Sequence, residues 1–301
     1  MLSPTHMITL SRLRQSPAVA LLLLCTCAPG TQARGQVIPA QGSQIDVDIY
    51  GDVYVLDEEK NTLQLYDRSG ALIREAGGPG WLDGQFDRPA GLWARNGIDV
   101  FVADYGNHRI ERFDRKLNFI SSFSTRDSDN PDIRFGYPTG IAISRQGDLY
   151  ICDTENDQIV KVDRTNTVER TFGGLGAGEG RLITPRQVQL GPADAIYVLD
   201  RGRVAVFDAF GNFLRNLLPG VLAAPTVLYA DETGVAVLDS ASVFFFDSHE
   251  RPAGVAPVGT LLPGSPAVRS FVCQGGSVWF LTASGVYRVS DPRRDSAGDR
   301  H

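Results

Sequence analysis

Histidine is scarce in this chain. Of its 301 residues only four are histidines, and two of these, His6 and His301, lie near the ends. The body of the chain keeps only His108 and His249. A zinc site built from three imidazoles is therefore excluded there.

Basic charge is also in short supply, since the formal net charge is −6. An acidic chain is a poor partner for nucleic acid, whose phosphates attract lysine and arginine. We therefore expect no nucleic-acid partner.

Long apolar runs are missing as well. The apolar stretch 18–24 is far shorter than the ~20 residues that a membrane-spanning helix needs. Arg12 and Arg14 precede this stretch, and the small residues at 31–33 follow it. This order predicts a signal peptide over 1–33, with the remaining protein exported to the periplasm or cell envelope.

Cysteine is rare: two of the four cysteines lie within residues 1–33 and two in the rest of the chain. The segment 24–27 resembles the box before the lipid-modified cysteine of bacterial lipoproteins, although Thr26 departs from the pattern. Lipidation of Cys27 is thus an alternative route that would tether the protein to a membrane. Cys152 and Cys273 fall in distant parts of the chain, and we expect them to be buried free thiols.

Glycine and proline, by contrast, are abundant, with 32 and 17 copies. Such a composition favours short strands and tight turns over helices. Hydrophobic residues make up 43% of the chain, which excludes intrinsic disorder.

A repeat of about 39 to 49 residues runs through 35–290. Its clearest element is a short hydrophobic strand ending in aspartate, which loses the acid in the last copy. The copies are 53–57, 100–104, 149–153, 196–200, 235–239 and 278–283. A second aspartate closes the next strand in five copies, at positions 67, 114, 163, 208 and 247. Four prolines, at positions 89, 138, 185 and 225, open a further strand. Four antiparallel strands repeated six times predict an all-β, six-bladed β-propeller.

Residues 89–114 and 138–163 resemble the NHL repeat family. The first segment has Pro89, Gly91, Asp104, Asn107 and Arg109 in the order of that repeat, and the second follows it nearly as well. The later copies lose the glycine and the Asn-x-Arg element. The resemblance covers 35–290 and implies the propeller fold, while it leaves the function open.

The sixth copy lacks its outer strand, so another segment must supply that strand to close the ring. We predict that 35–39 supplies this strand and so protects the sheet edges. The charged segment 291–301 is predicted to be a disordered tail.

A glycine-rich segment, 173–181, looks like a phosphate-binding loop. It lacks the Lys-Ser/Thr ending, and 77–84 has its glycines at the same spacing before a proline. We interpret both segments as architecture. The repeated aspartates likewise fit turns, where carboxylates accept hydrogen bonds from backbone N–H groups.

Some propellers of this kind are enzymes, and lactonase-type relatives bind calcium through Asp and Asn. The resemblance therefore leaves calcium open as a cofactor, with Asp46 and Asp48 as metal candidates. No other cofactor is expected.

Loop length points to a binding surface on one face of the ring. The two aspartates lie ten residues apart in the first three copies and eight apart in the next two. The face with the loops between the second and third strands should therefore rise over blades 1 to 3. An extra loop, 125–134, joins it there. The residues predicted to gather are Tyr105, His108, Arg126, Arg134, Tyr137 and Glu155. The alternative is a merely solvated group of loops.

The first residues of the inner strands should line the channel mouth on the same face. The candidates are Gln44, Arg186, Gln187 and Arg269. The two arginines either hold an anionic group or pair with nearby acids.

These observations predict an exported, monomeric, non-catalytic scaffold. It would bind a protein, peptide or glycan through the face that carries these long loops, its upper face. Contact with a membrane is expected only through a lipid anchor. The alternative is a calcium- or other metal-dependent hydrolase or lyase with its site at the channel mouth.

Overall fold

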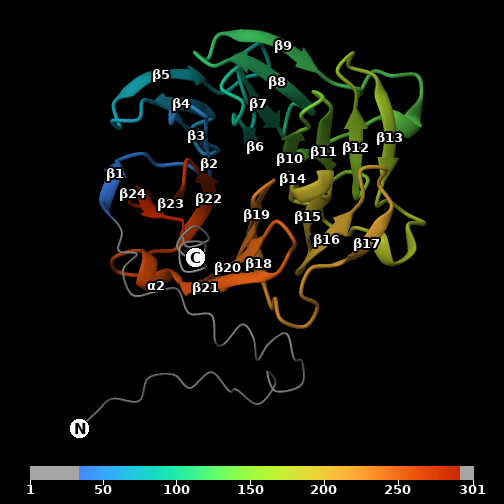
Figure 1. Cartoon of the computed structure of the whole chain (residues 1–301). Coiled ribbons are helices and arrows are strands. Elements are labelled where there is room, and N and C mark those ends of the chain that lie inside the picture. The colour runs from blue at the N-terminus through green and yellow to red at the C-terminus, as the bar shows by residue number, and fades with distance from the viewer. Residues whose placement is uncertain (1–33, 292–301) are drawn as a thin grey trace.

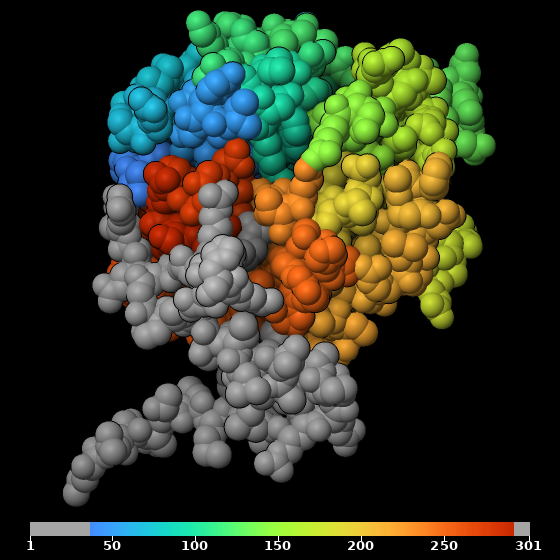
Figure 2. Space-filling model, in the orientation of Figure 1, coloured from blue at the N-terminus to red at the C-terminus, as the bar shows by residue number. Residues whose placement is uncertain are grey.

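Six four-stranded antiparallel sheets form a ring in the computed structural model, which describes residues 34–291. The chain passes through the sheets in order, so blade 6 lies beside blade 1 (Figures 1 and 2). The predicted all-β six-bladed propeller is thus confirmed. The predicted signal peptide, Cys27 and nearly all of the predicted tail lie outside the described residues.

Within each of blades 1 to 3 the first strand is innermost (Figure 1). The strands are β2 (Gln44–Val47), β3 (Val53–Asp57), β4 (Thr62–Tyr66), β5 (Leu72–Gly77), β6 (Pro89–Trp93), β7 (Asp99–Asp104), β8 (Arg109–Asp114), β9 (Phe119–Phe123), β10 (Pro138–Ile143), β11 (Leu149–Asp153), β12 (Gln158–Val162) and β13 (Val168–Phe172).

Blades 4 to 6 repeat this order, with a short helix, α2 (Val258–Leu261), between blades 5 and 6. Their strands are β14 (Gln187–Leu190), β15 (Ile196–Asp200), β16 (Arg203–Phe207), β17 (Phe213–Asn216), β18 (Pro225–Asp231), β19 (Gly234–Asp239), β20 (Ser242–Asp247), β21 (Pro252–Pro257), β22 (Val268–Gln274), β23 (Ser277–Thr282) and β24 (Gly285–Ser290).

The ring closes as predicted. Strand β1 (Arg34–Ile38) pairs antiparallel with β24 and becomes the outer strand of blade 6. Ile38 is buried in the hydrophobic cluster that joins blades 5, 6 and 1. This pairing covers the edge that β24 would otherwise expose.

Glycines on two inner strands let neighbouring blades approach closely. A Cβ atom on Gly91 would lie 2.7 Å from the carbonyl oxygen of Thr139. One on Gly140 would lie 2.8 Å from the carbonyl oxygen of Arg186. These contacts give the physical reason for the glycine that follows the proline in blades 2 and 3.

The hydrophobic core lies between the blades. One cluster joins blades 1 and 2 and includes Leu63, Phe86 and Phe113. Cys152 and Cys273 are both buried and are not joined in a disulfide, as predicted. No helix among residues 34–291 is long and apolar enough to cross a membrane.

The propeller has two faces. We call the upper face the one with the loops between blades and between second and third strands. The lower face carries the other hairpins. On the lower face, Asp67 accepts hydrogen bonds from the backbone N–H groups of Ser69 and Ala71. Asp163 likewise accepts from the backbone N–H groups of Thr165 and Thr167. These carboxylates are turn caps, as the sequence predicts.

Candidate functional site

The upper face does rise over blades 1 to 3. The loops between second and third strands are 58–61, 105–108 and 154–157 in these blades, but only 201–202 and 240–241 in blades 4 and 5. Longer loops on rigid sheets are common places for binding residues.

Two buried aspartates fix these loops to the segments before the inner strands. Asp104 accepts a hydrogen bond of 2.7 Å from the backbone N–H of Asp87 and bonds of 2.7 and 2.9 Å from the side chains of Asn107 and Arg109. Asp153 likewise accepts from the backbone of Gly136 at 3.1 Å. The Asp, Asn and Arg of the repeat therefore hold the loops in place.

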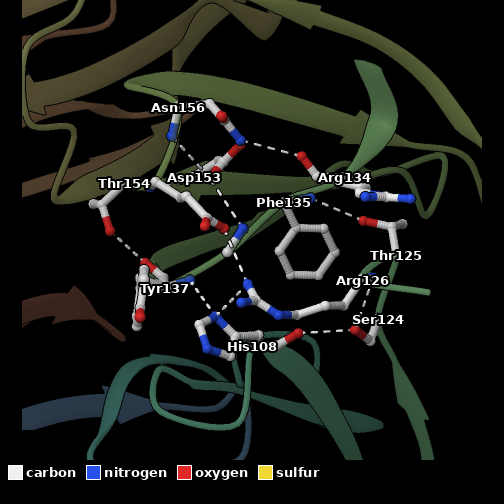
Figure 3. Close-up of polar contacts among 12 residues, drawn as sticks. His108, Ser124, Thr125, Arg126, Arg134, Phe135, Tyr137, Asp153, Thr154 and Asn156 are labelled. Carbon is white, nitrogen blue, oxygen red and sulfur yellow. Dashed lines mark hydrogen bonds and ion pairs between the residues drawn. The ribbon is translucent and has the colours of Figure 1, made fainter. Parts of the chain in front are cut away.

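The long loop before β10 is anchored in the hydrophobic cluster between blades 2 and 3. Phe135 is fully buried, its N–H donates to Oγ1 of Thr125 at 2.9 Å, and its ring stacks on Phe123. Arg134 was predicted to join the binding residues. Its Nε donates to the carbonyl oxygen of Ser128 at 2.7 Å, so Arg134 braces the loop. Its backbone carbonyl oxygen accepts a hydrogen bond of 3.2 Å from Nδ2 of Asn156 (Figure 3).

His108 contacts Arg126 and Tyr137, two other residues of the predicted group (Figure 3). Its Nδ1 accepts a hydrogen bond of 3.1 Å from the backbone N–H of Tyr137, which leaves the ring proton on Nε2. Nη1 of Arg126 lies 3.2 Å from the same Nδ1 and 3.1 Å from Oε2 of Glu155. Burial and, to a smaller extent, the charge of Arg126 lower the pKa of His108.

An aromatic series extends from this histidine. The ring of Tyr137 lies 4.2 Å from that of His108 and 5.0 Å from that of Tyr105. The guanidinium of Arg88 lies over Tyr105, 5.1 Å from its centroid. Sequence reasoning missed Arg88, although it directly precedes Pro89 as Tyr137 precedes Pro138.

These six residues form what we call the upper cluster. Its members are Arg88, Tyr105, His108, Arg126, Tyr137 and Glu155. All are partly or fully exposed, and they come from blades 2 and 3. Cationic, anionic and aromatic groups thus share one preorganised patch.

The channel-mouth candidates contact their neighbours. Gln44 accepts a hydrogen bond from Ser270, and Gln187 accepts one from the backbone of Leu228. Arg269 donates to the carbonyl oxygen of Gly42 at 2.9 Å. Within residues 34–291, neither Arg269 nor Arg186 forms an ion pair with an acid, the alternative that the sequence left open.

Arg95 crosses the channel, which the sequence did not predict. It contacts Oδ1 of Asp46 at 3.3 Å, Oε1 of Gln189 at 2.7 Å and the carbonyl oxygen of Ala230 at 2.9 Å. It also lies 4.4 Å from the ring centroid of Tyr229. One side chain on blade 2 therefore links blades 1, 4 and 5.

The two metal candidates, Asp46 and Asp48, are held by different partners. Asp46 is held by Arg95 and by the N–H of Ala94, and burial raises its pKa. Asp48 caps the next turn by accepting from Tyr50 and Asp52. No three His, Cys, Asp or Glu side chains within 34–291 are placed to share a metal ion.

The glycine-rich loops have matching structures. Phe86 and Leu182 are both fully buried, and each would be struck by a Cβ atom placed on the first glycine of its own loop, Gly77 or Gly173. The two loops are the same structural element in blades 2 and 4, as predicted.

The fold and the loop-borne surface place this chain among six-bladed β-propellers. The NHL repeat pattern matches residues 135–162, which span the first three strands of blade 3. The chain therefore carries an NHL repeat within a six-bladed propeller, in agreement with the resemblance in its sequence.

Two proteins of similar sequence support this assignment. Protein brain tumor of Drosophila melanogaster is 30% identical over 141 residues, 46% of this chain. Human NHL repeat-containing protein 3 is 26% identical over 138 residues, 40% of this chain. The chain matches only 13% and 40% of the lengths of these relatives.

Solved structures share the fold at low sequence identity. A streptogramin B lyase superposes with a TM-score of 0.58 at 15% identity, over 82% of this chain and 78% of its own. A catalytically inactive virginiamycin B lyase from Staphylococcus aureus with quinupristin gives 0.61 at 13% identity, over 87% and 99%. At such identities the likeness concerns architecture.

Proposed function

We propose that this protein is an exported, non-catalytic binding scaffold whose upper cluster docks a protein, peptide or glycan partner. The observation that carries the proposal is the convergence of the upper cluster. Five of the six loop residues that the sequence singled out come together, joined by Arg88.

The chemistry of the cluster suits an extended polar partner with aromatic or apolar groups. Tyr105 and Tyr137 offer ring faces, while Arg126 and Glu155 offer one charge of each sign. Exposed ion pairs contribute little to folding stability, so their charges are available to a partner at low cost. Aromatic and arginine side chains are also enriched at binding hot spots.

The test compares capture by two faces of the same protein. Tyr105→Ser with Arg126→Ser removes one aromatic and one cationic member of the upper cluster. Tyr50→Ser with Arg68→Ser removes a matched pair of residue types from the lower hairpins of blade 1. Immobilised variants are incubated with envelope extract, and the captured species are identified and quantified.

We expect the wild type and the lower variant to capture the same specific species. The upper variant should capture at least tenfold less of it. Equal capture by all three proteins would contradict the proposal. Thermal melting of each variant shows whether a loss of capture reflects unfolding.

A further inference from the structure

A cavity opens between blades 2 and 3 on the lower face, away from the upper cluster. We call it the lower groove, and its volume is about 790 Å³. Its apolar wall consists of Trp93, Phe101, Ile110, Phe123, Ile143 and Leu149.

Blade 1 shows how such an interface is bridged. Tyr54, Leu65 and Arg74 lie side by side on three successive strands. The hydroxyl of Tyr54 donates to the carbonyl oxygen of Arg115 at 2.9 Å, and Arg74 donates to Oδ1 of Asn118 at 2.8 Å. Both acceptors belong to the lower turn of blade 2.

Blades 3 and 4 carry the same pair in the same row. Arg170 lies in the row of Tyr150 and donates to the carbonyl oxygen of Phe210 in blade 4 at 2.8 Å. In blade 4, Tyr197 and Arg215 both contact Glu250 of blade 5. The arginine on the fourth strand thus joins each of these blades to the next, and the tyrosine hydroxyl on the second strand does so in blades 1 and 4.

Blade 2 lacks both bridging side chains. Its row is Phe101, Arg112 and Ser121. Phenylalanine has no hydroxyl and serine is too short to cross, while Arg112 pairs with Asp99 of its own blade at 2.9 Å. The corresponding cavity between blades 3 and 4, where Tyr150 replaces Phe101, is only about 200 Å³.

The Arg112–Asp99 pair also leaves Arg164, the arginine at the next lower turn, without an acid to pair with across the interface in the described part of the chain. In blade 2, Arg115 forms an ion pair of 2.9 Å with Asp52 across the interface with blade 1. Arg164 holds the equivalent place in blade 3, but Asp99, the equivalent of Asp52, is taken by Arg112. Within residues 34–291, Arg164 makes no hydrogen bond or ion pair. Its side chain lines the lower groove.

We propose that the lower groove binds a small anionic amphiphile, a molecule with an apolar aromatic or aliphatic body and one carboxylate or sulfonate group. Its volume falls within the range of small-molecule sites. One wall is apolar, and polar and charged side chains, Arg164 among them, line the rest of the groove. The guanidinium of Arg164 is suited to bind an oxyanion through two parallel hydrogen bonds.

The test uses two fluorescent probes that differ in one group. Anilinonaphthalene sulfonate has an aromatic body and an anion, and phenylnaphthylamine has the same body without the sulfonate. The double variant Phe101→Tyr with Ser121→Arg gives blade 2 the tyrosine and arginine that blade 1 has in this row. We call this variant the restored row. Its control, Ser122→Arg, adds the same charge on the opposite side of the same strand.

We expect saturable binding of the sulfonate by the wild-type protein and by Ser122→Arg, and at least tenfold weaker binding by the restored row. Arg164→Gln should weaken binding of the sulfonate about tenfold and leave phenylnaphthylamine unchanged, because only the anion uses the guanidinium. Arg68→Gln, at the equivalent turn of blade 1, should change neither.

Two results would overturn the proposal. One is the absence of saturable binding by the wild-type protein. The other is equal affinity for the sulfonate in the wild type, the restored row and Arg164→Gln. If the restored row does not fold, the surface variant Arg164→Gln still decides the question.

Discussion

Buried arginines join parts of this propeller that the sheets alone leave separate. Arg109 donates to the carbonyl oxygens of Trp81, Leu82 and Gln85 at 2.7 to 3.0 Å and so holds the loop before β6. Arg95 donates to the buried carbonyl oxygen of Ala230 across the channel. Hydrogen bonds from a charged donor to buried carbonyls are stronger than neutral ones, and a missing donor would leave those carbonyls unsatisfied.

Glu111 shares the first of these networks and should make stability depend on pH. It is fully buried, and its Oε1 accepts from Arg109 at 2.8 Å and from the N–H of Gly84 at 3.2 Å. Its Oε2 has no hydrogen-bond partner. Burial raises the pKa of Glu111 to about 8, partly offset by Arg109.

Because this pKa is higher in the folded than in the unfolded state, protonated Glu111 favours folding. Its contribution is complete below the ordinary glutamate pKa and is lost as pH rises through about 8. Urea unfolding at about pH 5 and about pH 9 should therefore show wild-type stability falling by about 1–3 kcal/mol from this group. Glu111→Gln should flatten that fall, whereas Glu58→Gln, on the exposed upper face, should not. Identical pH dependence in all three proteins would contradict this account.

At the scale of elements, the glycine-rich loops show what a repeated motif contributes. Each loop bends back so that one apolar side chain enters the interface between blades. Phe86 does so beside Phe113, with ring centroids 5.9 Å apart, and Leu182 does so in blade 4. The loop tip, by contrast, carries Leu175, which is 87% exposed.

The loops therefore contribute stability through their buried anchor and not through their glycine-rich tip. Phe86→Ala should lower the free energy of unfolding by about 3–5 kcal/mol, because it leaves a cavity. Leu175→Ala should change it by less than about 0.5 kcal/mol, as is usual for an exposed residue. Urea denaturation measures both. Comparable losses from the two substitutions would show that the tip is also structural.

Much of the fold and part of the site could be predicted because their signals are local. The strand ending in Asp104 or Asp153 repeats at a nearly fixed spacing, and the spacing of the aspartates gives the loop lengths that raise Tyr105 and Glu155. Arg95 could not be predicted, since a hairpin residue reaches partners on blades 4 and 5 only once the ring has closed. The lower groove also escaped prediction, because it depends on a comparison of strand register among blades.

At the scale of the whole molecule, stability depends on closing the ring with its first strand. Each blade buries its faces against two neighbours, so an open ring would expose one blade on each side of the break. Strand β1 prevents this because it comes from the beginning of the described chain and completes the last blade. Ile38 anchors it in the cluster that joins blades 5, 6 and 1.

Ile38→Ala should therefore weaken the closure more than an equivalent change elsewhere on the rim. The side chain is 1% exposed, so its truncation should cost about 2–5 kcal/mol of unfolding free energy. Leu72→Ala, on the outer strand of blade 1, removes a side chain that is 55% exposed and should cost less than about 1 kcal/mol. Urea denaturation of the full chain measures both, and gel filtration shows whether the weakened edge promotes association. If the two variants lose the same stability, β1 does not lock the ring. A larger loss for Ile38→Ala with an unchanged denaturant slope would show that closure stabilises the six blades as one cooperative unit.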